Sequence, residues 1–415
     1  MTVALLKYYE RNQQKSQTKF MKTGYSIRTW RMRLVCPEPI WLDRTEEYFQ
    51  NVVEFYYHLL RQHEELWNSS LFDIQRSLEL LTLAGRDGRQ PTNPLPMGKV
   101  PVYLRRAAIN KASATVKSTQ ELQSGFPEKL EAKVTFFKGM YSDLTDRSIC
   151  LKLWNGEKWI WTDCNLKGRP FPQDGQLMSP TLVKEGRRYL LNIPVKQENS
   201  DARTAKERMA EGTNLCSVRF TNTDTFAVCC ILDEQGNQLA VHTCRGGDAY
   251  RHRCKLLETR IQKSRPNTVG DNSPQPNRKY YMHLKNLSQH YAHQVSREIL
   301  NFCKENQAGI IVLPDYDQNF TRMAMVKSGN FSPLHLSSKI RTNLQYKAWA
   351  EGILVLETRT DGLKDKCAIC GGKVRRKGNE FLCENGHQGN RFLNDAKNLG
   401  RKCQESFSRK EGKPG

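Results

Sequence analysis

Residues 367–387 read CAICGGKVRRKGNEFLCENGH. The Cys-x-x-Cys pair Cys367 and Cys370 predicts a turn that points two thiolates at one ion, and the glycines that follow permit that turn. A second knuckle supplies Cys383, and His387 stands one residue beyond the place of a further cysteine. The stretch therefore predicts a zinc ribbon with these four ligands, and the alternative is a degenerate ribbon without metal. Because four protein ligands leave no position for a substrate, we expect the zinc to be structural.

The sequence around this ribbon predicts an α/β domain. Short apolar runs bounded by turn residues indicate strands, and apolar residues that recur every three or four positions indicate helices. A last helix is expected after the ribbon. The expected strands are 215–220, 226–233, 238–244, 309–313 and 353–357, and the expected helices are 249–264, 279–305, 335–351 and 393–407.

The first half of the chain has a different pattern. Residues 25–35 alternate apolar and basic residues, which predicts a strand with arginines on its outward face. Short β-like runs separated by turns recur over 130–195 and are expected to form one small antiparallel sheet or barrel with that first strand. Between them, a long helical stretch from Asp43 to about Leu83 and a basic helix over 101–124 would then be an insertion.

Composition limits the class of function. The 415 residues contain 65 Lys+Arg and 43 Asp+Glu, which gives a net charge of +22 spread along the chain. Such an excess is typical of proteins that neutralise phosphates along a nucleic acid. The apolar runs are too short to cross a bilayer, and the first residues lack the apolar region of a signal peptide. We therefore expect no membrane partner and a cytoplasmic, nucleoid-associated protein.

The second half of the sequence resembles the RuvC-like nuclease core of the TnpB/OrfB proteins of insertion sequences and of the type V CRISPR effectors. The first half is similar to the wedge barrel of that family with its helical recognition insertion. The combination of a ribbon and an Asn-x-Ala-x-Asn helix directly after it is the most specific feature. The segments that carry the resemblance are 215–241, 293–299, 309–315, 346–353, the ribbon and 394–400.

The resemblance implies a multi-domain α/β fold. It consists of a wedge-type β-barrel with a helical recognition insertion, followed by an RNase H/RuvC-like core with an inserted zinc ribbon. The expected parts are a flexible basic N-terminus (1–22), the wedge barrel (23–40 and 126–198), the recognition insertion (41–125), a linker (199–213), the RuvC-like domain (214–360 and 388–407), the ribbon (361–387) and a tail (408–415).

The resemblance also implies RNA-guided DNA binding, in which a guide RNA pairs with one strand of a target double-stranded DNA. In nucleolytic members, three carboxylates hold two divalent ions that cleave phosphodiesters. This sequence departs from the pattern at all three positions, which are occupied by Arg219, Pro314 and Phe392. Proline and phenylalanine cannot ligate magnesium, and arginine repels it. We therefore expect no catalytic Mg²⁺ and no DNA cleavage.

A shifted set of acids is the alternative to this reading. Asp224, Asp315 and Asp395 lie close to the three positions in sequence. A shift of one residue along a strand turns a side chain to the other face, so three coordinated shifts would be needed. The simpler interpretation is that Asp224 caps a turn, Asp315 is a solvated strand end and Asp395 lies in the first turn of a helix, where it suits the helix dipole.

The basic residues are candidate contacts for phosphate groups. Each one is also interpretable as a solvated surface charge, so the set carries more weight than any member. The candidates are Arg28, Arg31, Arg33, Arg105, Arg106, Lys111, Lys117, Arg251, Arg253, Arg260, Arg375 and Arg376.

The sequence thus predicts a nuclease-inactive, RNA-guided DNA-binding protein that acts by occupying its target or by recruiting a transposition or transcription protein. Two alternatives remain open: an active RNA-guided endonuclease with displaced acids, and a guide-independent DNA-binding accessory protein of a transposon. A homodimer on one RNA, as in miniature members of the family, is a further expectation that the residues do not decide.

Overall fold

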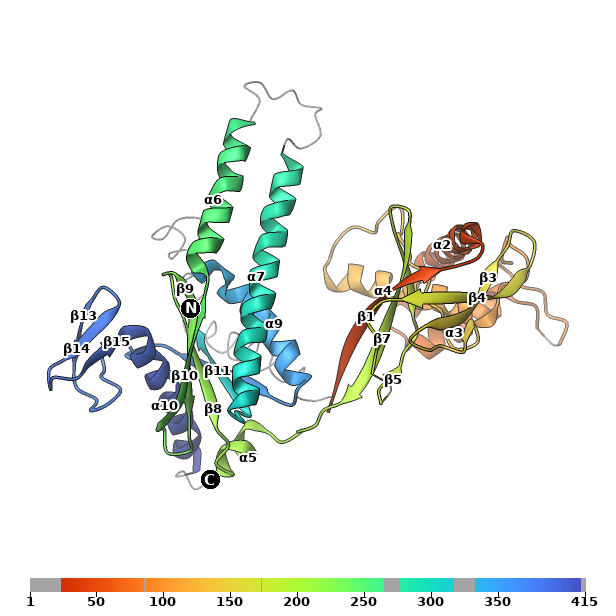
Figure 1. Ribbon diagram of the computed structural model, residues 1–415. Coiled ribbons are helices and arrows are strands. Elements are labelled where there is room, and N and C mark those ends of the chain that lie inside the picture. Colours follow the sequence, from red (N-terminus) through yellow and green to blue (C-terminus); the bar gives the residue numbers. More distant parts are fainter. Residues whose placement is uncertain (1–23, 86, 173, 265–276, 317–332, 412–415) are drawn as a thin grey trace. The chain divides into compact units, whose positions relative to one another are not determined.

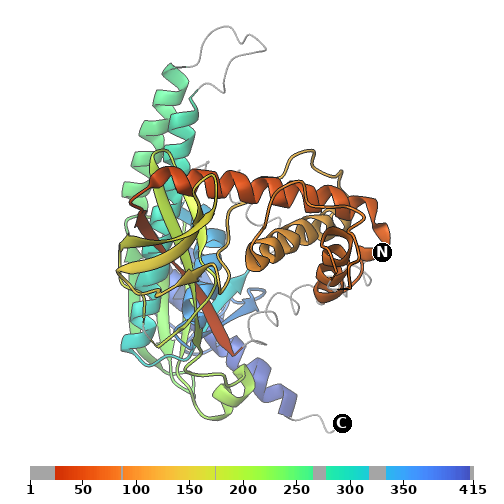
Figure 2. The same ribbon diagram turned by 90° about the vertical axis from the view of Figure 1, so that its right-hand side faces the viewer.

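The computed structural model describes residues 24–85, 87–172, 174–264, 277–316 and 333–411 (Figure 1). The chain divides into two compact units, one formed by residues 27–197 and the other by the flanking segments up to 26 and from 198 onward. The same ribbon in a second orientation separates the strands of the first unit from its helices (Figure 2). The predicted flexible N-terminus, 1–22, lies outside the described residues.

The first unit is built on a sheet with strand order β2-β3-β4-β1-β7-β5, in which β6 also pairs with β7. The first strand of the chain lies in the middle of this sheet, so the chain leaves the sheet after one strand, forms helices and returns. Buried Met32 and Leu34 alternate with exposed Arg31 and Arg33, as the period-two pattern predicts. The strands are β1 (Tyr25–Val35), β2 (Tyr141–Ser142), β3 (Ser148–Trp154), β4 (Trp159–Lys167), β5 (Gln176–Leu177), β6 (Thr181–Glu185) and β7 (Arg188–Glu198).

The helices of this unit correct one expectation, because the stretch predicted as a single helix from Asp43 to Leu83 is broken. Helix α2 (Pro39–Gln62) begins earlier, at a proline that suits the first helical turn. A 3₁₀ turn, Glu64–Leu66, follows, and α3 (Leu71–Thr82) starts where the Ser70 hydroxyl accepts a hydrogen bond from the Asp73 backbone N–H. This N-cap was the sequence signal for the break. The basic helix α4 (Val102–Glu121) completes the insertion.

The second unit contains a sheet with strand order β10-β9-β8-β11-β12. The strands β8, β9 and β10 are antiparallel, whereas β11 pairs in parallel with both β8 and β12. Helices α6 and α7 form a long hairpin (Figure 1). The elements are α5 (Ala205–Ala210), β8 (Leu215–Phe220), β9 (Thr225–Leu232), β10 (Gln238–Arg245), α6 (Gly247–Lys263), α7 (Arg278–Glu305), β11 (Ile310–Asp315), a 3₁₀ turn (Pro333–Leu336), α9 (Ser337–Trp349), β12 (Leu354–Arg359), β13 (Val374–Lys377), β14 (Glu380–Cys383), β15 (Gln388–Asn390) and α10 (Arg391–Glu411).

Each face of this sheet has its own core. Cys216 and Val218 of β8 pack with α6, α7 and α9, whereas Leu215 packs with Leu399 of α10. Because side chains alternate along a strand, Arg219 of β8 belongs to the face that α10 covers. This assignment decides which side chains meet at the carboxyl ends of β8 and β11.

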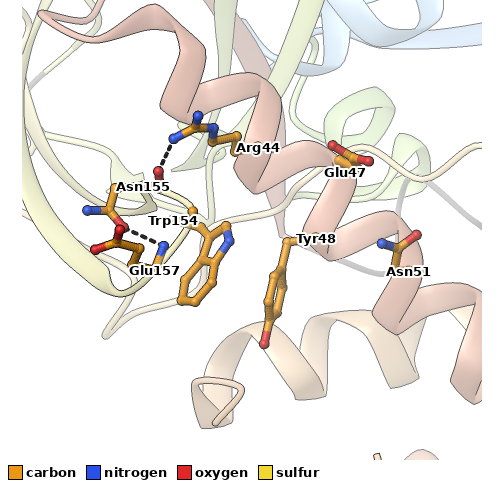
Figure 3. Close-up of a pocket in the computed structure, with 8 residues that line it drawn as sticks. Arg44, Glu47, Tyr48, Asn51, Trp154, Asn155 and Glu157 are labelled. Carbon is orange, nitrogen blue, oxygen red and sulfur yellow. Dashed lines mark hydrogen bonds between the residues drawn. The ribbon is translucent and has the colours of Figure 1, made fainter. Parts of the chain in front are cut away.

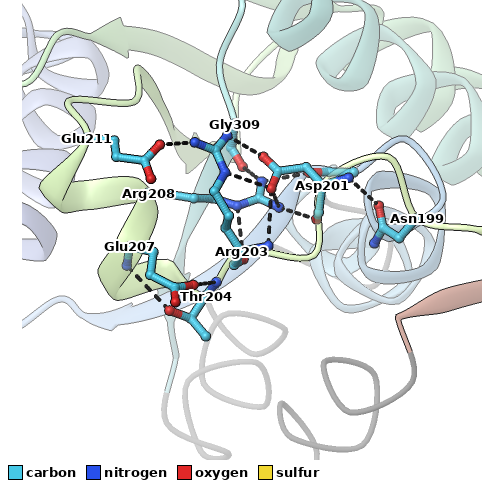
Figure 4. A network of polar contacts seen from close by, with 9 residues as sticks. Asn199, Asp201, Arg203, Thr204, Glu207, Arg208, Glu211 and Gly309 are labelled. Atoms are coloured by element: carbon cyan, nitrogen blue, oxygen red, sulfur yellow. Dashed lines mark hydrogen bonds and ion pairs between the residues drawn. The ribbon is translucent and has the colours of Figure 1, made fainter.

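The predicted linker, 199–213, is an ordered element and corrects that expectation. Thr204 and Glu207 form a capping box that starts helix α5. The guanidinium of Arg208 is fully buried and donates to the carbonyls of Gly309, Gly352 and Asp201 (Figure 4). Burial lowers the pKa of Arg208, while the neighbouring Asp201 carboxylate opposes that shift. A charge buried in this way fixes the linker against the starts of β11 and β12.

The predicted tail, 408–415, is also partly wrong, because α10 continues to Glu411. None of the helices in the described ranges is long and apolar enough to cross a membrane.

Candidate functional site

The ribbon brings its four predicted ligands together. One ligand atom of each of Cys367, Cys370, Cys383 and His387 lies within 4.8 Å of the others. The thiols of Cys370 and Cys383 are 3.3 Å apart. The Nδ1 atom of His387 is buried and has no hydrogen-bond partner among the described residues, as suits an atom that ligates a metal. Three thiols and an imidazole at these distances can coordinate one metal ion tetrahedrally, as in structural zinc sites.

The surroundings of Cys370 favour the ionised form of its thiol. The backbone N–H groups of Ile369 and Asn385 point at the sulfurs of Cys367 and Cys383. The side-chain amide of Asn385 donates to Cys370, and this bond is the main reason that the pKa of that thiol is lowered to about 6. Thiolates are the form that binds metal, so the lowered pKa of Cys370 favours cation binding at this position.

The Asn-x-Ala-x-Asn motif fastens this ribbon to α10. Asn394 donates to the Lys366 carbonyl at 2.8 Å and accepts from the Ala368 N–H at 2.8 Å. Asn398, one turn later on the same face of the helix, also donates to the Lys366 carbonyl. Ala396 between them is fully buried against the sheet. The motif that identified the resemblance therefore positions the ribbon over the helix.

The three positions where the resemblance expects carboxylates lie on the α10 side of the sheet. Arg219 is on β8, Pro314 is on β11, and Phe392 is in the first turn of α10. Because these two strands are parallel neighbours, their carboxyl ends meet at one edge of the sheet. Each position is occupied by a residue that serves the packing of this edge.

Arg219 forms an ion pair with a carboxylate on α10. Its Nε lies 3.3 Å from Oδ2 of Asp395. The two atoms form an ion pair, but their geometry is not that of a hydrogen bond. Its Nη1 donates to the Tyr316 hydroxyl at 2.6 Å. The side chains of Arg219 and Asp395 are only 12% and 4% exposed, so the pair is largely shielded from water.

The other two positions are equally engaged. Nη2 of Arg341 donates to the Pro314 carbonyl at 3.0 Å, and Nε of Arg341 lies 3.3 Å from Oε1 of Glu357. Phe392 is buried, and the guanidinium of Arg391 lies 4.6 Å from the centre of its ring. The ion pair of Arg341 and Glu357 is not among the predicted site residues, because it forms only when α9 packs on β12.

A second guanidinium completes the environment of Asp395. Nη2 of Arg376, on ribbon strand β13, donates to Oδ1 of Asp395 at 2.6 Å. Burial first, and then Arg219 and Arg376, lower the pKa of the neighbouring Lys364. Burial and the same two guanidinium groups also lower the pKa of Arg391. The edge that would hold two divalent cations in a nuclease therefore holds a concentration of fixed positive charge.

The shifted acids are not brought together. Asp224 is exposed in the turn between β8 and β9, where its carbonyl accepts from Gly247 N–H. Asp315 lies two residues after Leu313 on β11, so both side chains belong to the same face of the sheet. Leu313 packs on the face opposite α10. The interpretation that Asp395 lies in the first turn of a helix is wrong, because α10 has no acidic residue in its first turn, and Asp395 is buried between two guanidinium groups. In the described ranges, these three carboxylates form no cluster of ligand distance.

Most of the predicted phosphate contacts are accessible. Several of the partly exposed ones are already bound within the protein: Lys117 donates to the Ser69 carbonyl and Arg251 pairs with Asp248. The exposed ones are Arg31, Arg33, Arg106, Lys111, Arg253, Arg260 and Arg375, and the partly exposed ones are Arg28, Lys117, Arg251 and Arg376.

The prediction is wrong for Arg105. This side chain is buried, and its Nη2 lies 3.0 Å from Oε1 of Glu79, which Arg106 also contacts. Both adjacent arginines of the basic helix α4 thus contact α3 through Glu79. No local pattern predicts this contact, because Glu79 lies on a separate helix.

A pocket of about 560 Å³ in the first unit is lined by Arg44 and Glu47 of α2 and by Trp154 and Glu157 of the β3–β4 hairpin (Figure 3). Trp154 packs at 5.0 Å from the ring of Tyr48. The guanidinium of Arg44 donates to the Asn155 carbonyl. Because one arginine faces two carboxylates, this pocket is not part of the basic surface.

Comparison with known proteins gives a fold but no close relative. Residues 26–155 match the Aq_aa04 family. No curated protein matches the chain.

Among solved structures, the chain is similar to the protein of a Cas12f1–sgRNA–target DNA complex, with a TM-score of 0.52 and 12% identity over 91% of this chain and 99% of that one. It is also similar to the mini-RNA-guided endonuclease CRISPR-Cas_phi3, with a TM-score of 0.50 and 9% identity over 94% and 96%. The chain therefore has the fold of the type V CRISPR effectors along nearly its whole length.

Proposed function

We propose that this chain is an RNA-guided protein that binds a chosen site in double-stranded DNA and does not cut it. A structured RNA is held on the protein, its guide pairs with one DNA strand, and protein side chains read a short flanking motif. The first unit then serves as the wedge-type barrel with its recognition insertion, and the second serves as the RuvC-like domain with a structural zinc in the ribbon.

The observation that carries this proposal is the ion pair between Arg219 and Asp395. It lies at the edge of the sheet where nucleolytic members hold their metal ions. A guanidinium in that place neutralises the buried carboxylate and repels a divalent cation. Pro314 and Phe392 supply no ligand atom from their side chains. The net charge of +22 and the exposed arginines support a polyanionic partner.

A protein that binds a target without cutting it acts through occupancy. Its effect on the DNA is then either exclusion of other proteins or recruitment of a transposition or transcription protein. A second copy on the same RNA belongs to this proposal, and the mass of the purified ribonucleoprotein, measured by light scattering, decides between one chain and two.

The test begins with the RNA that co-purifies when the chain is expressed with the DNA that flanks its gene. This RNA is sequenced, and a plasmid library is prepared with the complementary target of about 20 base pairs next to randomised bases. In magnesium chloride, the expected result is retention of supercoiled plasmids that share one flanking motif, with no nicked or linear product.

Two results would overturn the proposal in different ways. Magnesium-dependent cleavage at the target that disappears in Asp315→Ala would identify an active nuclease with displaced acids. Target preference that survives ribonuclease treatment of the complex would identify a guide-independent DNA-binding protein.

A further inference from the structure

A second cluster of metal-ligating side chains lies on edge strand β10 and helix α7. One ligand atom of each of His242, Cys244 and Glu298 lies within 4.8 Å of the others. His242 and Cys244 are two residues apart on the strand and project from the same face, while Glu298 faces them from the helix. Nε2 of His242 and Oε1 of Glu298 are 2.6 Å apart. A nitrogen, a sulfur and an oxygen ligand therefore converge on one point.

The burial of these groups suits an ion that enters from solvent. Cys244 is fully buried, whereas the side chains of His242 and Glu298 are 35% and 32% exposed. Strand β10 is at the edge of its sheet, and no further strand of the described residues covers that side. The ring of His242 packs 5.2 Å from the ring of Phe302, which restricts its orientation. The thiol thus forms the floor of the site, and the imidazole and carboxylate form its rim.

The sheet behind the site is rich in sulfur. Cys229, on the adjacent strand β9, lies opposite His242 in the strand register, and Cys229, Cys216 and Cys244 are buried in the same core. A simple ion pair explains why His242 faces Glu298, but it gives no reason for a thiol to lie within ligand distance of both.

The ligand types indicate which metal the site would take. Thiolate and imidazole together favour zinc and similar ions over magnesium or calcium.

We propose that His242, Cys244 and Glu298 bind a divalent transition-metal ion, with zinc as the expected one, in an exchangeable site. Three protein ligands leave one coordination position to water, unlike the closed set of four in the ribbon. The bound ion connects β10 to α7, and its occupancy follows the free metal concentration.

The test is a cobalt(II) titration of the full-length protein, dialysed against a weak chelator that leaves the ribbon ion in place. Cobalt(II) held by a thiolate and an imidazole in four-coordinate geometry absorbs in the visible and near-ultraviolet range, whereas aqueous cobalt(II) is almost transparent. We expect one equivalent of cobalt to bind in addition to the ribbon ion and to give absorption bands in both the visible and the near-ultraviolet range. Replacing the ribbon ligand Cys383 by serine is expected to leave the binding of this cobalt equivalent unchanged.

Variants assign the bands. His242→Gln and Glu298→Gln change partly exposed side chains and are expected to weaken cobalt binding about tenfold or more. Cys244→Ser is expected to remove the sulfur-to-cobalt band. The matched controls His290→Gln, an exposed histidine on α7, and Cys254→Ser, a buried thiol of α6, should leave binding intact. Either the absence of a second equivalent in the native chain or bands that survive His242→Gln would overturn the proposal.

Discussion

The ribbon and the carboxyl ends of β8 and β11 are the two places where the family resemblance implies metal binding. They differ in whether the residues that could ligate a metal are present. The ribbon retains a complete set of ligands in ligation distance. The sheet edge has Arg219, Pro314 and Phe392 in place of acids. A metal that closes a small ribbon contributes its binding energy to folding, so its ligands cannot be lost without losing the ribbon. A metal that only cleaves DNA makes no such contribution.

The sheet edge shows what such a replacement requires. Asp395 is buried, and an isolated buried carboxylate is costly. Arg219 and Arg376 approach it from β8 and from the ribbon, so its charge is neutralised without any ion. The fold and the chemistry of this edge can therefore differ independently, which agrees with the principle that function resides in sites placed on folds.

The largest effect is expected at the ribbon. Cys383→Ser removes one of four ligands, and zinc binding that is worth about 10 kcal/mol or more in small zinc domains is then largely lost. The expected result is loss of bound zinc, measured by mass spectrometry, and rapid proteolysis between residues 361 and 390. Cys150→Ser, at a partly exposed thiol of β3, is the control and should leave both unchanged. A ribbon that stays protease-resistant without zinc would show that the metal is dispensable.

The next largest effect is expected at Asp395. Asp395→Asn leaves the largely buried guanidinium of Arg219 and the partly exposed one of Arg376 beside a neutral group, which typically costs about 3 kcal/mol. Denaturant unfolding measures this loss, and Asp224→Asn, in an exposed turn, is the control with an expected change below about 0.5 kcal/mol.

Magnesium sharpens this comparison. If the sheet edge holds no magnesium, added magnesium chloride shifts the unfolding midpoint of the native chain and of Asp395→Asn equally. Stabilisation by magnesium that Asp395→Asn abolishes would instead identify Asp395 as a metal ligand.

Arg376 joins the two regions, because it belongs to the ribbon and binds Asp395 on α10. Arg376→Gln removes a charged hydrogen bond worth about 2 kcal/mol, and we expect faster amide exchange in the first turns of α10 and in β13. The exposed neighbour Arg375 provides the matched control, since Arg375→Gln changes the same charge without breaking a contact. Equal exchange in the two variants would mean that ribbon and sheet edge are not coupled through this residue.

The sequence predicted what local patterns control. The Cys-x-x-Cys spacing identified the ligands of the ribbon, and period-two alternation placed Arg31 and Arg33 on the outer face of β1. The succession of three strands, two helices and further strands also agrees with the order of elements in the second unit. These features depend on neighbours within a few residues, which a sequence displays directly.

The features that were missed depend on partners distant in sequence. Arg208 is held by carbonyls at positions 309 and 352, so a stretch that is charged in sequence became an ordered helix and not a linker. The prediction that Arg105 contacts phosphate is wrong because its ion-pair partner, Glu79, lies on another helix. The ion pair between Asp395 and the largely buried Arg219 could not be predicted either. The sequence alone does not show which charged residues are buried.

The smallest expected effect concerns pH and Glu357, which lies on β12 beside the strand that carries Pro314. Burial raises the pKa of Glu357, Arg341 opposes this shift, and Asp315 adds to it. A carboxyl group with a raised pKa in the folded state contributes stability that is present below its ordinary pKa of about 4.3 and is lost as pH rises through the folded value. The unfolding free energy of the native chain, relative to Glu357→Gln, should therefore fall as pH rises from 4 towards neutrality. Because other carboxyl groups titrate in the same range, the measured quantity is the difference between the two proteins at each pH. A difference that grows with pH would mean that the Arg341 ion pair outweighs burial, and that this edge of the sheet attracts negative charge more strongly than proposed.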